Sequence, residues 1–310
     1  MRKVTKVIKK VFLVLLAVVV LFVAGAFAYH KVMLKKEASY WQNVPGQMVD
    51  VDGHKMHVYT EGEGDHTIVL MSAWGDGSPY VNFLPMCKEL AKENKVVIVE
   101  RFGYGFSDVV PGERDYDTIL ENDRTALKEL GIDGPYVLCP HSISGLEATI
   151  WAQKYPEEVE AVVGMDISIA DMKEEYEAQA NSVILPVYKT FRAMGLTRFA
   201  HLGAHSKEEK MQHAIENKIE MNDNVISEMK QAVDACDEIA GKPLPSVPTI
   251  QFISKTASDA YPDEWVGGHG ALVDASTNGK LIELNCDHYV YMFEQDRIVK
   301  EIGEFLKELD

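Results

Sequence analysis

The chain has 310 residues, of which 46% are hydrophobic, and it carries a formal net charge of −17 at pH 7. This length and composition allow one large buried core and exclude a disordered or repeat protein. All eight basic residues before Glu37 lie in the N-terminal segment, so the remainder has 23 basic and 48 acidic residues, a formal charge of −25. Such an acidic domain repels nucleic acid and anionic lipid headgroups, and we expect membrane contact through the N-terminal helix alone.

Residues 1–36 predict a cytoplasmic stub and a transmembrane anchor. The first ten residues, "MRKVTKVIKK", include five basic and no acidic ones, and 19 uncharged residues follow from Val11 to Tyr29. At about 1.5 Å per residue, such a helix nearly crosses a hydrocarbon core of about 30 Å. The cations before the apolar run favour a cytoplasmic N-terminus and an extracytoplasmic domain. The alternative is a signal peptide cleaved at the small-residue pattern Ala26-Phe27-Ala28.

Residues 37–310 predict an α/β domain. Six runs in it are rich in β-branched residues and nearly continuously apolar, as strands buried on both faces are. These runs are 66–72, 95–100, 135–140, 160–166, 248–254 and 280–285. Amphipathic helices, such as 81–93 and 118–131, lie between most of them. The alternation predicts a mostly parallel sheet with helices on both faces.

One long segment, about 170–243, breaks this alternation. It contains several helical stretches and no convincing strand. An all-helical insertion between two strands of such a sheet is typical of a cap over a site. The alternative, a separate small domain, is less favoured because the segment has strands on both flanks and no flexible linkers.

The segment "CPHSISGLEA" (139–148) places Ser142 between a predicted strand and a predicted helix. A serine at such a junction projects its hydroxyl above the sheet edge, where the N–H groups of the helix start can point toward it. The tight turn requires small residues two positions before and after. Ser144 meets the second requirement, and Pro140 suits an extended strand end. Ser144 itself is a poorer nucleophile because bulky residues would surround its turn.

Four motifs in order resemble those of the α/β-hydrolase superfamily: "VLMSAWGDGSP", "VERFGYGFSD", "PHSISG" and "NCDHYVY". The resemblance covers about residues 47–309 and is closest to capped hydrolases, which include prolyl aminopeptidase-like and esterase-like members. It implies an α/β-hydrolase fold and serine-dependent hydrolysis. The sequence differs from the family's usual motifs at two places, and these differences bear on the substrate class more than on the chemistry. The elbow reads P-H-S-I-S rather than G-x-S-x-G, and Ser72-Ala73 stands where the family usually has His-Gly.

His288 is the predicted general base. It follows the last predicted strand and precedes a final amphipathic helix, so it lies at the same carboxyl edge of the sheet as Ser142. The resemblance implies the same residue, because this family uses the chain order serine, acid, histidine. His141 is interpreted as a packing residue. A ligand role for the cap histidines, His201, His205 and His213, is a weaker alternative.

Two aspartates compete for the role of triad acid, which orients the imidazole and stabilises its charged form. Asp166 ends the predicted strand 160–166, and Asp259 lies five residues beyond the strand 248–254. The family more often keeps the acid in the second of these loops. Asp166 could instead be a noncatalytic residue that caps a turn. We favour Asp166 because it stands directly at a strand end.

The backbone N–H groups of Ile143 and Trp74 are the predicted oxyanion hole. Ile143 follows the nucleophile, and Trp74 lies in the glycine-containing loop "SAWGDG". An ordinary turn would explain the glycines of that loop equally well, and the Trp74 ring could also form a wall of the pocket.

These residues together predict a membrane-anchored serine hydrolase that cleaves an ester or amide of a small substrate through an acyl-enzyme. A prolyl-type aminopeptidase is one alternative, because acids in "DMKEEYEAQ" (171–179) could hold a substrate ammonium, although a solvated helix face explains them too. A catalytically silent binding protein of the same fold is the other. No cofactor is predicted, and no metal, because no cluster has metal-ligand spacing. The four widely spaced cysteines favour buried free thiols, with a disulfide as the alternative.

Overall fold

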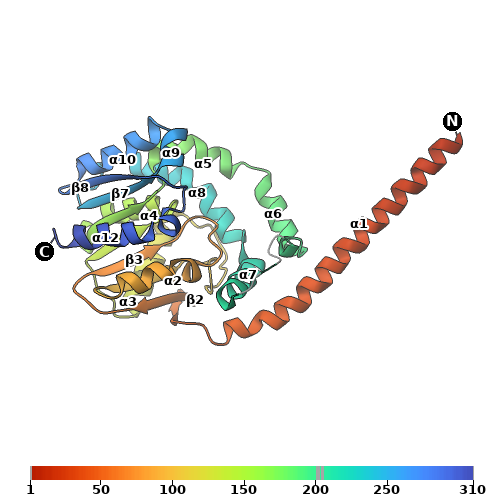
Figure 1. The fold of residues 1–310 in the computed structure, drawn as a ribbon, viewed down its shortest axis with the longest axis horizontal. Coiled ribbons are helices and arrows are strands. Elements are labelled where there is room, and N and C mark those ends of the chain that lie inside the picture. The colour runs from red at the N-terminus through yellow and green to blue at the C-terminus, as the bar shows by residue number, and fades with distance from the viewer. Residues whose placement is uncertain (1, 200–202, 204–205, 310) are drawn as a thin grey trace.

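The computed structural model describes residues 2–199, 203 and 206–309. Eight strands of the described chain form one sheet in the order β1-β2-β4-β3-β5-β6-β7-β8, with helices on either side (Figure 1). The strands are β1 (Gln47–Val51), β2 (His54–Glu61), β3 (Thr67–Met71), β4 (Lys95–Glu100), β5 (Tyr136–Pro140), β6 (Val159–Met165), β7 (Thr249–Ser254) and β8 (Gly279–Leu284). β1 and β2 form an antiparallel edge, β2 also runs antiparallel to β4, and the remaining neighbours are parallel.

Helices cover both faces of the sheet because successive strand residues point to opposite sides. In β4, Val97 and Val99 enter one core cluster, and Val96 and Ile98 enter the other. The first cluster is completed by α3 (Tyr116–Glu129), α4 (Ser144–Lys154) and α10 (Glu264–Ala275), and the second by α2 (Pro79–Leu90) and α12 (Gln295–Leu306). The nearly continuous apolar strands are thus explained by burial on both faces.

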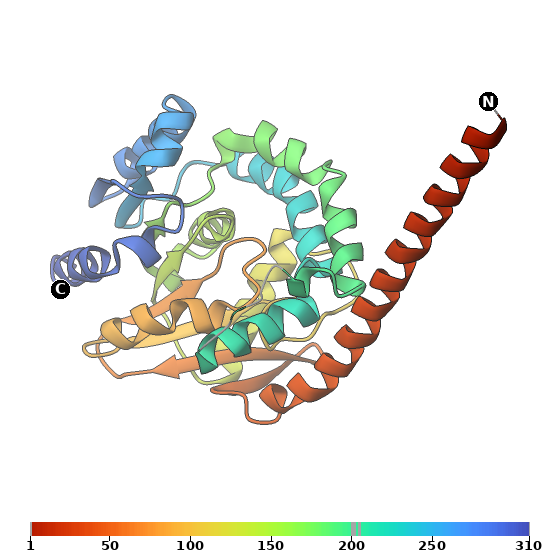
Figure 2. The ribbon, with the colours of Figure 1, turned by 45° about the vertical axis from the view of Figure 1, so that its right-hand side comes forward.

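Within its described residues, the segment between β6 and β7 contains helices and no strand. Its elements are η3 (Ala170–Met172), α5 (Lys173–Ala180), α6 (Ile184–Ala193), η4 (Thr197–Phe199), α7 (Lys207–Ile219) and α8 (Asp223–Ala240). Figure 2 shows these helices grouped between the sheet and the N-terminal helix. We refer to this segment as the cap.

The N-terminal helix, α1 (Arg2–Glu37), projects from the domain (Figure 1). It is the one helix in the described part of the chain that is long and apolar enough to cross a membrane, by length and composition. Its most apolar 18-residue window has a mean hydropathy of 3.1, and 6% of that window is buried. A signal sequence has the same properties. The short helix η1 (Ala38–Trp41) connects α1 to β1.

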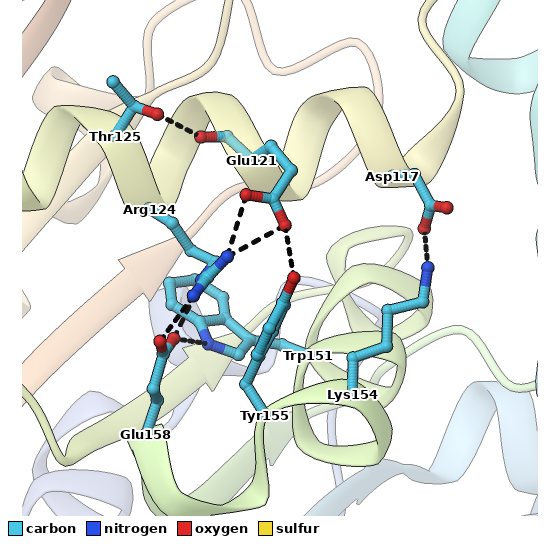
Figure 3. Close-up of polar contacts among 8 residues, drawn as sticks. All are labelled: Asp117, Glu121, Arg124, Thr125, Trp151, Lys154, Tyr155 and Glu158. Carbon is cyan, nitrogen blue, oxygen red and sulfur yellow. Dashed lines mark hydrogen bonds and ion pairs between the residues drawn. The ribbon is translucent and has the colours of Figure 1, made fainter.

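The C-terminal half of α4 is fixed to α3 by a network around Arg124 (Figure 3). The guanidinium donates to both carboxylate oxygens of Glu158, at 2.5 and 2.8 Å, and to those of Glu121, at 2.8 and 2.9 Å. Glu158 also accepts from the indole N–H of Trp151, and Glu121 from the hydroxyl of Tyr155, both at 2.9 Å. The network therefore holds the C-terminal end of α4, the helix whose N-terminal end lies beside Ser142.

The predicted fold class, an α/β fold with a mostly parallel sheet, is confirmed. Each of the six predicted strands is present, with both ends within one residue of the prediction. The predicted helices 81–93 and 118–131 correspond to α2 and α3. The hairpin of β1 and β2 was not assigned from the sequence, nor were α9 (Lys255–Ala260), α10 and the short α11 (Val290–Phe293). The four cysteines, all within the described residues, are unpaired.

Candidate active site

Ser142 lies in the middle of the three-residue turn between β5 and α4 and has a φ of +55°. A positive φ is uncommon for a residue other than glycine and persists where the surroundings impose it. Two backbone hydrogen bonds do so here. The N–H of His141 donates to the carbonyl of Met71 at 2.9 Å, and the N–H of Ser168 donates to the carbonyl of Ser142 at 2.8 Å. The strained turn directs the Ser142 side chain into a cavity of about 400 Å³.

A hydrogen-bonded chain links Ser142, His288 and Asp166. The Ser142 hydroxyl lies 2.9 Å from Nε2 of His288, and Nδ1 of the same ring lies 2.7 Å from Oδ2 of Asp166. With Nδ1 protonated toward the carboxylate, Nε2 is free to accept the serine proton. This is the arrangement in which a serine hydroxyl can act as a nucleophile.

Asp166 is held by donors from two further elements. Its Oδ1 accepts from the N–H of Ser254 at 2.6 Å and from the indole N–H of Trp265 at 3.1 Å, and its Oδ2 accepts from the Ser254 hydroxyl at 2.8 Å. Burial alone would raise the pKa of Asp166, but the hydrogen bond and charge of His288 and the Ser254 donors outweigh it and lower this pKa below its ordinary value. Asp166 therefore carries its negative charge near neutral pH.

Asp259 lies elsewhere. It is exposed on α9, where its carboxylate accepts from Nζ of Lys255 at 2.7 Å. The five residues after β7 form a helical turn that directs this side chain into solvent. Of the two aspartates that the sequence offered, the structure brings Asp166 to His288.

Ser144, the alternative nucleophile, points away from the cavity and is fully buried. Its hydroxyl lies 3.0 Å from the carbonyl of Met71 and 2.9 Å from that of His141, and it accepts from the N–H of His141 at 3.0 Å. Ser144 therefore ties the turn to β3.

Trp74 and Ile143 both line the cavity beside Ser142. Ile143 immediately precedes α4, so its N–H belongs to the helix-start donors that have no partner within the helix. The loop of Trp74 is fixed from two sides. The indole N–H donates to the carbonyl of Val225 in the cap at 2.7 Å, and Nη2 of Arg101 donates to the carbonyl of Ser72 at 2.9 Å. The backbone N–H groups of these two residues are therefore the candidate donors to a developing oxyanion.

A buried cluster of charged residues around Arg101 holds the Trp74 loop in place. Nη1 of Arg101 lies 2.9 Å from Glu228 on α8 and 3.4 Å from Glu147 on α4. The Tyr104 hydroxyl donates to Glu228 as well. Burial, and then the neighbouring carboxyl of Asp123, raise the pKa of Glu147, so the cluster carries less negative charge than its composition suggests. One arginine thus joins the Trp74 loop, the helix after Ser142 and the cap.

His141 lies directly beside the imidazole of His288, with ring centroids 4.9 Å apart. Its Nε2 donates to the carbonyl of His288 at 3.1 Å, and its Nδ1 has no hydrogen-bond partner in the described part of the chain. Burial, assisted by the nearby His288, lowers the pKa of His141 to about 3, so this ring is neutral. Its packing position agrees with the interpretation from the sequence, and it also holds the backbone of His288.

The cap and the segment after β7 form the outer walls of the cavity. Met172, Tyr176 and Glu175 come from the η3–α5 segment of the cap, and Tyr261 and Trp265 come from the α9–α10 segment. The volume and the mostly apolar lining are typical of a site for a small molecule. Glu175 brings one carboxylate of the acidic helix to the cavity, and its Oε1 accepts from Gln179 at 3.4 Å.

Several residues of the site were not assigned from the sequence. Ser254 could have been found, because it ends a predicted strand at the carboxyl edge of the sheet. Trp265 and Arg101 carried no such signal, since their roles depend on contacts between distant segments. Within the described residues, no group of three or more His, Cys, Asp or Glu side chains could hold a metal ion. Of the three cap histidines, His201 and His205 lie outside the described residues.

Comparisons with known proteins show which proteins this chain resembles in sequence and in fold. A sequence model of the alpha/beta hydrolase fold matches residues 67–221. The uncharacterized protein YbdG of Bacillus subtilis (strain 168) is 31% identical over 325 aligned residues, which cover the whole of both chains. The enol-lactonase of Burkholderia xenovorans LB400 has a TM-score of 0.62 at 19% identity, covering 84% of this chain and 100% of that one. A meta-cleavage product hydrolase of Pseudomonas fluorescens IP01 has a TM-score of 0.60 at 18% identity, covering 86% and 99%.

The matched region includes β3 with the Trp74 loop, the turn of Ser142, and β6 with Asp166, which directly follows it. The match of the sequence model and the full-length relative lead to the same conclusion as the topology of the sheet, and the chain belongs to the α/β-hydrolase fold family.

Proposed function

We propose that this protein is a membrane-anchored serine hydrolase that cleaves an ester or amide of a small substrate through an acyl-enzyme. The observation that carries the proposal is the chain of hydrogen bonds from Ser142 through His288 to Asp166. A binding protein without activity would not require a strained serine, a histidine and a buried carboxylate in one line, although the fold alone does not exclude it.

In the proposed reaction, the Ser142 hydroxyl attacks the substrate carbonyl carbon while its proton passes to Nε2 of His288. The carbonyl oxygen becomes an oxyanion, which the N–H groups of Ile143 and Trp74 stabilise. His288 then gives the proton to the departing alcohol or amine, and the acyl group remains on Ser142. A water molecule, deprotonated by His288, attacks the acyl carbon. The bond from this carbon to Oγ of Ser142 then breaks, His288 returns the proton to Oγ, and the acid is released. Asp166 stabilises the imidazolium in both steps.

The proposed substrate has a small or medium acyl group. The cavity of about 400 Å³ is at the lower end of the range for small-molecule sites, and its walls are largely apolar. A prolyl-type aminopeptidase requires a carboxylate that receives the substrate ammonium, and Glu175 is the residue of the cap that could do so. An aminoacyl amide therefore belongs in the assay panel beside simple esters.

The proposed location is the cell membrane, with α1 as a single span and the domain on the extracytoplasmic side. Apolar residues of α1 from Val11 to Leu21 are exposed in the isolated chain, which favours lipid as their surroundings. The basic residues before Val11 favour a cytoplasmic N-terminus.

Turnover of chromogenic esters by matched serine variants tests the hydrolase proposal. Ser142→Ala should lose turnover by several orders of magnitude. Ser144→Ala is the control and should keep most of its turnover at permissive temperature, with a loss of about 1 kcal/mol of stability from its hydrogen bonds. Full turnover in Ser142→Ala would exclude this residue as the nucleophile.

A further inference from the structure

The outer side of α6 in the cap is apolar, which is the reverse of an ordinary surface helix. We refer to this surface as the α6 face, and it consists of Val183, Ile184, Val187, Phe191, Met194 and Phe199 of the adjoining η4. Val183 and Ile184 are 77% and 67% exposed. The hydroxyl of Thr190, which is also exposed, donates to the carbonyl of Pro186 at 2.7 Å, so its hydrogen-bonding needs are met inside the helix.

The polar side of α6 points inward, toward the rest of the cap. The Tyr188 hydroxyl donates to Glu220 at 2.6 Å, and Nη1 of Arg192 donates to the carbonyl of Lys218 at 2.5 Å. These contacts fix the rotation of α6, so its apolar residues cannot turn inward without breaking them. The exposed face is therefore a property of the folded cap.

The α6 face continues into the apolar surface of α1. The rings of Phe199 and Phe22 are 5.4 Å apart, and Figure 2 shows the C-terminal end of α6 approaching α1 partway along its length. Phe22 lies seven residues before Tyr29, the end of the uncharged run, and this separation is about 10 Å along a helix. Phe199 thus lies beside a residue well inside the segment that the hydrocarbon should cover.

A buried contact fixes the cap to α1 at this point. Arg198 of η4 donates to both carboxylate oxygens of Glu37, at 2.7 and 2.8 Å, and its Nε donates to Nδ1 of His30 at 2.9 Å. Gly195 lets the chains approach closely, because a Cβ there would lie 2.4 Å from Cβ of His30. The cap and the end of α1 therefore keep one relative orientation.

We infer that the α6 face is a second membrane contact, which inserts into the same bilayer leaflet from which α1 emerges and seats the cap on the membrane. The inference rests on the proposed anchoring by α1. A helix with aromatic and aliphatic residues on one face, lying beside a membrane span, has the properties of an interfacial helix. It revises the expectation that membrane contact comes from α1 alone. The strongly acidic domain makes apolar insertion, rather than attraction to anionic lipid, the source of this contact.

A second copy of the chain is the other occupant that such a surface could take. The bilayer is favoured because the α6 face meets the exposed apolar residues of α1 at the Phe199–Phe22 contact, and lipid must cover α1 there in an anchored protein. A partner chain on the α6 face would have to enter the same lipid layer.

Depth-dependent fluorescence quenching tests the inference in the full-length chain, reconstituted in phosphatidylcholine vesicles with and without nitroxide-labelled lipid. Single cysteines carry the fluorophore in a Cys286→Ser background, because the other three cysteines are buried. Ile184→Cys reports on the α6 face and Val18→Cys on α1. Lys300→Cys on α12 is the matched control, since its side chain is 70% exposed and thus as accessible as Ile184.

The inference predicts strong quenching at positions 18 and 184 and none at position 300, in vesicles without anionic lipid. Quenching at position 18 without quenching at position 184 would overturn the inference and leave the anchor intact. No quenching at position 18 would instead contradict the proposed anchor. An unquenched label at position 184 whose emission changes with the number of protein copies per vesicle would assign the α6 face to a second copy.

Discussion

Nδ1 of His288 lies 2.7 Å from Oδ2 of Asp166, although 122 residues separate them in the chain. Asp166 follows β6, and His288 comes four residues after the end of β8, so both are at the carboxyl edge of the parallel strands. Ser142 reaches the same edge from β5. The distance favours Asp166 over Asp259 as the triad acid, because Asp259 forms its ion pair with Lys255 on the surface of α9.

Replacement of Asp166 by Asn should reduce turnover by about 10⁴-fold, the order of magnitude known for a triad Asp→Asn change in another serine hydrolase. The amide would leave the imidazole without the partner that holds its working tautomer. Asp259→Asn is the matched control and should lose less than about tenfold, since its carboxylate only pairs with an exposed lysine. Steady-state kinetics near neutral pH, with melting curves for both variants, measure the difference. The reverse ranking would move the acid to α9.

The charge of Asp166 also predicts a pH dependence of folding. Because its pKa is lowered in the folded state, the contribution of Asp166 to stability is present above its ordinary pKa of 3.8 and is lost as the pH falls through the folded value. The pKa of His141 is lowered in the folded state as well, because burial disfavours the protonated ring. In the unfolded chain the His141 ring binds a proton below about pH 6.5, whereas in the folded chain it does so only near pH 3. The free energy of unfolding therefore decreases as the pH is lowered from 6.5 to 3.

His141→Gln should therefore flatten the decrease in stability between pH 6.5 and pH 3, by up to about 1.4 kcal/mol per pH unit. Denaturant unfolding at a series of pH values measures the slope for the wild type and the variant. Parallel slopes would mean that the ring is protonated in the folded protein. The variant should also lose activity, because the hydrogen bond from Nε2 to the carbonyl of His288 helps to place the base.

Arg101 and Arg124 provide a matched pair, since the first arginine is buried and the second is partly exposed. Arg101→Met leaves the buried carboxyl of Glu228 without its cation, and it should cost about 3–5 kcal/mol of stability. Arg124→Met removes the network of Figure 3, which is partly solvated, and should cost about 1 kcal/mol. Activity at permissive temperature should fall in the first variant only, since Arg101 also holds the Trp74 loop. Equal losses in both would contradict this role.

The anchor predicts that the full-length protein remains in the membrane fraction through a carbonate wash. Peripheral proteins are released by this treatment, whereas a helix with 19 uncharged residues is not. Sequencing of the mature N-terminus separates the anchor from the signal peptide. A mature chain that begins at Tyr29 would show cleavage after Ala28, and it would also lose Phe22 and Ala26, which contact the cap.

The parallel core of the fold could be predicted because its strands are apolar on both faces and alternate with helices along the chain. The β1–β2 hairpin was missed because its strands contain charged and polar residues such as Asp50, His54 and Lys55. A signal was present in Asp52-Gly53, the two-residue turn that closes the hairpin. Both residues have a positive φ, which is typical of the turn type that Asp-Gly favours.

The catalytic candidates could be placed from the sequence because each stands at a strand end, and parallel strands bring their carboxyl ends together. The sequence could not decide between Asp166 and Asp259 as the triad acid, because the reach of each side chain depends on the path of the loop after its strand. Supporting residues such as Trp265 and Arg198 were beyond sequence reasoning, since each acts on a segment about 100 residues or more away in the chain. The reversed polarity of α6 appears only once the cap is folded.

The most direct measurement for the proposed hydrolase is the site of modification by a fluorophosphonate probe, which reacts with an activated serine hydroxyl. Labelled full-length protein is digested, and the modified residue is identified by tandem mass spectrometry. We predict a single adduct on Ser142, absent from Ser142→Ala and strongly reduced in a variant of His288, because the imidazole activates the hydroxyl. An adduct on Ser144, or no adduct on the folded wild-type protein, would contradict the account.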